Sequence, residues 1–141
     1  MMHPTHYTGI LLGAVAAWIF GAIYYTALSR PWLAAQDKTM EQCKAEQAGK
    51  SKLTFYLPFL LSFVGALLMG LTLYGILTHV GQFTVRAGAI SGAFCWLGFV
   101  LTTVTINNAY QGRRWSLTAI DAVHWLAVLV IIGAIVGWMG P

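Results

Sequence analysis

Four long apolar runs constrain this chain more than any other feature of its sequence. They cover residues 8–28, 53–78, 85–106 and 117–138. Each run has about 20 residues or more, and a helix of that length crosses a hydrocarbon core about 30 Å thick. Lipid offers the backbone no hydrogen-bond partners, so each run is expected to be helical. We therefore predict an all-α fold, a polytopic transmembrane bundle of four helices in one domain, residues 1–141.

Charged residues are too scarce to cover a surface that faces water. They make up 9% of the chain, and hydrophobic residues make up 58%, whereas soluble domains carry about 25% charged residues. The expected partner of most side chains is therefore the lipid bilayer. The net charge is +4, but basic residues beside spans usually record topology, so no nucleic-acid partner is expected.

The basic residues predict how the chain is threaded through the membrane. The connection over residues 29–52 carries five of them, and the connection between the third and fourth runs carries Arg113 and Arg114. Arg86 is the only Lys or Arg on the opposite side. Since basic connections stay inside the cell, the first and third connections are expected in the cytoplasm and both termini outside it.

Small residues recur at helical spacing in the apolar runs. Because lipid tails are as apolar as leucine, membrane helices associate where small residues let their backbones approach. These rows predict a compact bundle, and they leave open whether some of them serve a homo-oligomer instead. The glycines expected to pack helices are Gly9, Gly13, Gly21, Gly88, Gly92, Gly133 and Gly137.

The two halves of the chain resemble each other faintly. The first and third runs each place a tryptophan shortly after a Gly-xxx-Gly pair, Trp18 and Trp96, and are followed by "RPW" and "RRW". The second and fourth begin with "KLT" and "SLT". This pattern indicates a weak 2+2 repeat of a helical hairpin.

Polar residues that fall in membrane spans are costly and often functional. In this chain they gather where the third run ends and the fourth begins, which is the predicted cytoplasmic side. The candidate polar cluster comprises Asn107, Asn108, Arg113, Arg114, Asp121 and His124.

The segment "SLTAIDAVHW", residues 116–125, has two interpretations. Thr118 and Asp121 match the [ST]-x-x-[DE] pattern of a helix start, and Arg113 or Arg114 could pair with the carboxylate, which favours a cap and anchor. His124 lies one turn deeper on the same face, so the alternative is a site that handles protons or binds a ligand.

The sequence carries no recognisable signature of catalysis or metal binding. The sequence contains no HExxH, GxSxG or P-loop. Cys43 lies in a charged connection and Cys95 inside an apolar run, so the two are not expected to share a site. His3, His6 and His79 fall on one side of the membrane, but a terminus is a poor template for metal ligands. We expect no catalysis, no metal and no cofactor.

Three segments carry a resemblance to a known family. They are "GAIYYTALSRPW", "FVLTTVTINNAYQGRRW" and "IDAVHWLAVLVIIGAIVGW". With them, the chain resembles small bacterial membrane proteins grouped as domain of unknown function 1761, over essentially its whole length. The resemblance implies a four-span protein of the bacterial inner membrane and brings no activity or catalytic residue with it.

Two functions follow from these expectations. The first is a structural or accessory membrane component whose polar cluster ties helices together. The alternative is a small oligomeric transporter or permeability module, with a polar vestibule around Asp121 and His124 on the cytoplasmic side.

Overall fold

The computed structural model describes the backbone of residues 4–141 and the side chains from Tyr7 onward. His3 and the side chain of His6, considered above for a metal, therefore lie outside the described residues. Every element in the described chain is a helix, which confirms the all-α prediction. The elements are α1 (Pro4–Ala27), α2 (Ser29–Ala34), α3 (Met40–Ala48), α4 (Lys52–Val80), α5 (Val85–Cys95), the π-helical η1 (Trp96–Leu101), α6 (Thr102–Tyr110) and α7 (Trp115–Met139).

Four helical rods are long and apolar enough to cross a membrane, as predicted. They are Tyr7–Ala27, Lys52–Val80, Val85–Tyr110 and Trp115–Met139. The third rod joins α5, η1 and α6 end to end. By length and composition, the chain is a multi-pass membrane protein.

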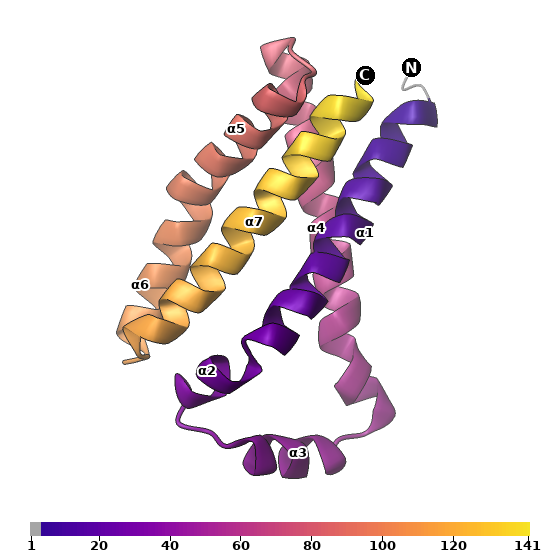
Figure 1. The fold of residues 1–141 in the computed structure, drawn as a ribbon. Coiled ribbons are helices and arrows are strands. Elements are labelled where there is room, and N and C mark those ends of the chain that lie inside the picture. The colour runs from indigo at the N-terminus through magenta and orange to yellow at the C-terminus, as the bar shows by residue number, and fades with distance from the viewer. Residues whose placement is uncertain (1–3) are drawn as a thin grey trace.

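The rods alternate in direction, and α7 lies among the other three (Figure 1). It packs against α1, α4 and α5, and it also contacts α2 and α6. The start of α1 and the end of α7 lie at one end of the bundle, whereas α2, α3 and the α6–α7 connection lie at the other (Figure 1). We call the latter the loop end.

Local sequence signals explain where several helices begin and end. The hydroxyls of Ser51 and Thr84 accept the backbone N–H of Thr54 and Ala87, which caps α4 and α5. Gly81 ends α4 in a left-handed conformation with φ of 71°, which glycine adopts at little cost. Gly81, which ends α4, and Thr84, which caps α5, together set the short connection between these two helices.

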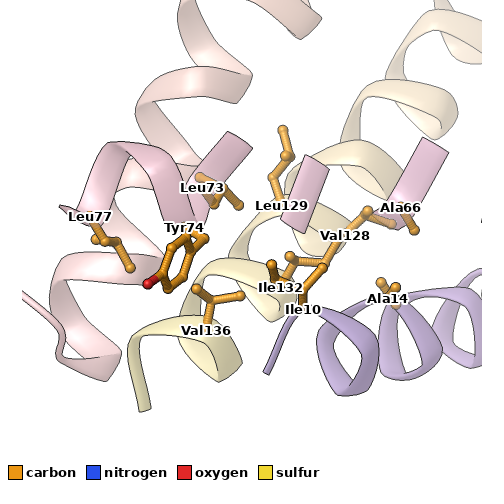
Figure 2. Close-up of a cluster of buried hydrophobic side chains, with 11 residues drawn as sticks. Ile10, Ala14, Ala66, Leu73, Tyr74, Leu77, Val128, Leu129, Ile132 and Val136 are labelled. Carbon is orange, nitrogen blue, oxygen red and sulfur yellow. The ribbon is translucent and has the colours of Figure 1, made fainter. Parts of the chain in front are cut away.

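The apolar core lies where α1, α4 and α7 meet (Figure 2). Leu77 of α4, Ile132 of α7 and Ala14 of α1 are all fully enclosed in this core. The outer faces stay apolar as well: Leu60 and Phe94 are 59% and 69% exposed. Such exposure of large apolar side chains is the expected pattern for helices surrounded by lipid.

Glycines bring α5 and α7 into backbone contact. A methyl group added at Gly88 would collide with the carbonyl of Gly133, and one added at Gly133 would collide with the carbonyl of Gly88. Gly92 and Gly137 have the same relation to the carbonyls of Leu129 and Thr84. No larger residue fits at these positions without moving a helix, so glycine sets the distance between the two rods.

The glycines of α1 face the other side of α7. An added Cβ at Gly9 would lie 3.0 Å from the Cβ of Met139, and one at Gly13 would lie 3.4 Å from the Cα of Ile132. All seven glycines of the predicted rows therefore lie at contacts made by α7, Gly21 being described with the site below.

Alanine at Gly88 should loosen the α5–α7 contact, because its methyl group has no space against the backbone of α7. We expect Gly88→Ala to destabilise the protein by about 1–3 kcal/mol, the usual cost of overpacking. Gly65→Ala is the matched control, since no atom lies within 4 Å of an added Cβ there. Thermal unfolding in detergent measures both, and equal stability of the two variants would contradict the contact.

Candidate functional site

Five side chains from other helices donate hydrogen bonds to one short stretch of α7. This stretch, residues 118–122, is called here the acceptor segment. Its donors come from α1, α2, η1 and α6, so it is joined to each of these elements. The donors are Tyr24, Tyr25, Trp32, Trp96 and Asn108.

Three of these bonds are accepted by uncharged groups of the acceptor segment, two backbone carbonyls and one hydroxyl. The Tyr24 hydroxyl donates to the carbonyl of Ile120 at 2.7 Å, and Trp96 Nε1 donates to the carbonyl of Ala122 at 2.7 Å. Asn108 Nδ2 donates to the hydroxyl oxygen of Thr118 at 3.0 Å. A helix carbonyl has a second lone pair, so α7 accepts these bonds without losing its own.

Asp121 is the charged member of the acceptor segment. Its Oδ1 accepts a hydrogen bond from the Tyr25 hydroxyl at 2.7 Å and another from Trp32 Nε1 at 3.2 Å. Tyr25 belongs to α1 and Trp32 to α2, so one carboxylate oxygen joins three helices. Hydrogen bonds to a charged acceptor are stronger than neutral ones.

His124 lies one turn further along α7 and is surrounded by aromatic rings. The residue is 7% exposed. The ring of Phe20 is nearly parallel to the imidazole, at 14° and 6.2 Å between centroids, while Tyr25 and Trp125 lie at 4.7 and 4.8 Å. Tyr24 completes the enclosure at 5.5 Å.

Gly21 makes room for the imidazole on the α1 side. A Cβ at this position would lie 3.0 Å from Nε2 of His124, which is closer than carbon and nitrogen normally pack. The other ring nitrogen, Nδ1, is buried and has no hydrogen-bond partner in the described chain. Gly21 is therefore part of the histidine site as well as of the helix contact.

The predicted cap of α7 is wrong. The helix begins at Trp115 rather than 117, and its N-cap, Arg114, makes no capping side-chain bond. Thr118 instead accepts from Asn108, and Asp121 accepts from α1 and α2. Asp121 lies six residues after Trp115, about 9 Å along the helix, which is beyond the first turn that a cap serves.

The predicted anchor of Asp121 to an arginine is also wrong. Arg114 forms an ion pair with Asp37, in the connection between α2 and α3. Arg113 Nε donates to the side chain of Gln111 at 3.3 Å, and Asn107 is exposed. Of the candidate polar cluster, the structure brings Asn108, Asp121 and His124 to the acceptor segment or next to it, and leaves Asn107, Arg113 and Arg114 outside.

Sequence reasoning singled out Asn108 but not the other four donors. Tyr24 and Tyr25 had no predicted role, and Trp32 and Trp96 served only as marks of the repeat. The available signal was the stretch "YYTALSRPW", where rings with polar tips concentrate directly after a span. Pairing those tips with Asp121 required knowing that α2 folds back onto α7.

Metal ligands do not gather at this site. Within the part of the chain that the structure describes, no three His, Cys, Asp or Glu residues come together in a way that could hold a metal ion. Nδ1 of His79, at the opposite end of the bundle, lies 2.8 Å from the carbonyl of Gly75 in its own helix.

Comparison with known proteins identifies the family. The model of a family described as "Protein of unknown function (DUF1761)" matches residues 8–137. The chain belongs to this family, which confirms the resemblance drawn from the sequence. The searches of curated proteins and of solved structures returned no match.

Removal of the Tyr25 hydroxyl should weaken the tie between α1 and α7. We expect Tyr25→Phe to lower the free energy of unfolding by about 1–3 kcal/mol, because Asp121 loses one of two charge-assisted bonds. Tyr56→Phe is the control, since this tyrosine is 62% exposed. Thermal unfolding in detergent gives both values.

A double-mutant cycle assigns that loss to the Asp121 contact. In an Asp121→Ala background the Tyr25 hydroxyl has no acceptor, so Tyr25→Phe should cost much less than in the wild type. Equal costs in the two backgrounds would show that the hydroxyl acts elsewhere.

Proposed function

We propose that this chain is a structural or accessory component of the bacterial inner membrane, with both termini outside the cytoplasm. The observation that carries the proposal is the acceptor segment, where the intramembrane polar groups of α7 bind donors from the same chain. Polar residues in spans either line a pathway or join helices. The bonds made by Asp121 support the second role.

The loop end supports the same interpretation. α2 is attached to α7 through Trp32 and Asp121, and the connection after α2 is attached to the α6–α7 connection through Asp37 and Arg114. Leu33, in α2, is only 4% exposed. These contacts hold the first connection against the bundle, leaving α3 as the projecting part of the loop end (Figure 1). A partner on the cytoplasmic side would meet α3 first.

The proposed orientation can be tested with the natural cysteines. In a Cys95→Ser variant, Cys43 of α3 is the single remaining thiol, because the chain has two cysteines. We expect Cys43 to resist a membrane-impermeant maleimide in intact cells and to react in inverted vesicles. Gln82→Cys, with both natural cysteines replaced by serine, is the control and should react in intact cells. The reverse pattern would refute the orientation.

The second candidate function is a small transporter or permeability module. The observation that favours it is Nδ1 of His124, a buried polar atom in a span without a partner in the described chain. Unsatisfied polar groups in spans often mark a path for ions or protons. The two candidates differ in what the purified protein does in a closed vesicle.

A flux measurement in liposomes separates the two functions. Under the structural proposal, vesicles that contain the wild-type protein should show no proton or solute flux above protein-free vesicles. Asp121→Asn should then lower thermal stability without removing any activity, because the acceptor loses its charge. A wild-type flux that Asp121→Asn abolishes, in a variant that still inserts and folds, would overturn the proposal in favour of transport.

A further inference from the structure

The imidazole of His124 lacks a bond that its own helix could have supplied. Nδ1 of a helical histidine can bond the carbonyl one turn earlier, as His79 does with Gly75 at 2.8 Å. For His124 that carbonyl belongs to Ile120, which already accepts the Tyr24 hydroxyl at 2.7 Å. Within α7 the same carbonyl also accepts the backbone N–H of His124. Both lone pairs of Ile120 are in use, so Nδ1 has no local partner.

Asp121 lacks a basic partner. Its two donors, Tyr25 and Trp32, are neutral groups. The ion pairs in the described part of the chain join other residues, Arg114 with Asp37 and Lys38 with Glu46. An ionised carboxylate in a span is costly unless an opposite charge lies nearby.

One proton on His124 would give Asp121 a counter-charge. His124 follows Asp121 by three positions, so the two side chains lie on one face of α7. An imidazolium at His124 is the counter-charge that Asp121 lacks, and the ring of Phe20, which lies nearly parallel to the imidazole, presents its face to a cation there. We infer that Asp121 and His124 form a proton-binding site, in which His124 carries the proton and Asp121 is its counter-charge.

The surroundings define which groups share this site. From α1, the titratable side chains that face the imidazole are Tyr24 and Tyr25, and from α7 it is Asp121. Tyr25 contacts both members of the pair, because its hydroxyl bonds the carboxylate and its ring lies against the imidazole. Asp121 is only partly buried, which gives the pair a route for proton exchange with water at the loop end.

Proton binding at this site is coupled to α2. The carboxylate that balances the imidazolium is the same group that accepts Trp32 Nε1. When the proton leaves, the full negative charge of Asp121 rests on Tyr25 and Trp32, and both bonds strengthen. The indole of Trp32 therefore reports the protonation state of a histidine that it does not touch.

The test is ¹⁵N NMR of histidine side chains across a pH titration, with the full chain in nanodiscs. His3→Gln, His6→Gln and His79→Gln together leave His124 as the single histidine, because the chain has four. We expect the imidazole to bind one proton reversibly, with the Trp32 indole N–H signal shifting over the same pH range. An imidazole that stays neutral over the whole range in which the fold persists would overturn the site.

Asp121→Asn in this background tests the counter-charge. Loss of the carboxylate should weaken proton binding by His124 about tenfold or more. Asp37→Asn is the matched control, since this aspartate binds Arg114 at the surface, and it should leave the titration of His124 unchanged. Equal titrations in Asp121→Asn and the wild type would refute the pairing while leaving the structural proposal untouched.

Tyr24→Phe provides a second test that keeps Asp121 intact. It frees one lone pair of the Ile120 carbonyl, so Nδ1 gains the partner that His79 has in its own helix. The neutral imidazole should then carry its proton on Nδ1, which the ¹⁵N shifts of the two ring nitrogens distinguish. Unchanged shifts would contradict the explanation given for the unpartnered nitrogen.

Discussion

Lipid removes the usual driving force for helix association, so this bundle depends on what α7 offers to its neighbours. A leucine gains little by leaving lipid for a helix interface, whereas close backbone approach and hydrogen bonds both contribute. The half of α7 near the C-terminus presents Gly133 and Gly137 to the backbone of α5. The half near the loop end presents residues 118–122 as hydrogen-bond acceptors. Backbone contact and polar contact therefore occupy separate lengths of one helix.

This division explains why the buried polar groups gather at the loop end. Tyrosine and tryptophan place an apolar ring in the acyl region of the membrane and a polar tip near the headgroups. An acceptor for such a tip must therefore lie close to the membrane–water interface. Tyr24, Tyr25 and Trp32 provide such tips where α1 leads into α2. Asp121 is tolerated there, since it lies about 9 Å from the start of α7 rather than at the membrane centre, where a charge costs most. The position of the carboxylate follows from the position of its donors.

Features that depend on local periodicity could be predicted from the sequence, and features that depend on tertiary pairing could not. Apolar run length predicted the four rods, and glycine spacing pointed to residues that lie at the contacts of α7. The cap at Asp121 failed because α7 begins at Trp115, and the arginine anchor failed because Asp37, far away in sequence, binds Arg114. Nothing in the local pattern of "SRPW" indicates that α2 folds back far enough for Trp32 to reach Asp121. The π-helical stretch at Trp96–Leu101 likewise had no signal in the composition of the third run.

The predicted repeat offers a comparison for the positions of Asp121 and His124. In the first hairpin, Trp18 of α1 donates to the carbonyl of Phe59 at 3.2 Å, and in the second, Trp96 donates to the carbonyl of Ala122 at 2.7 Å. When "KLT" is aligned with "SLT", Asp121 and His124 correspond to Leu57 and Leu60, which are 43% and 59% exposed. Both hairpins thus use a tryptophan to join their spans, but only α7 is enclosed at this depth by α1 and α2. A leucine is stable in contact with lipid, whereas a buried carboxylate requires hydrogen-bond donors. The type of residue at these positions therefore depends on whether neighbouring helices enclose it, and not on its place in the repeat.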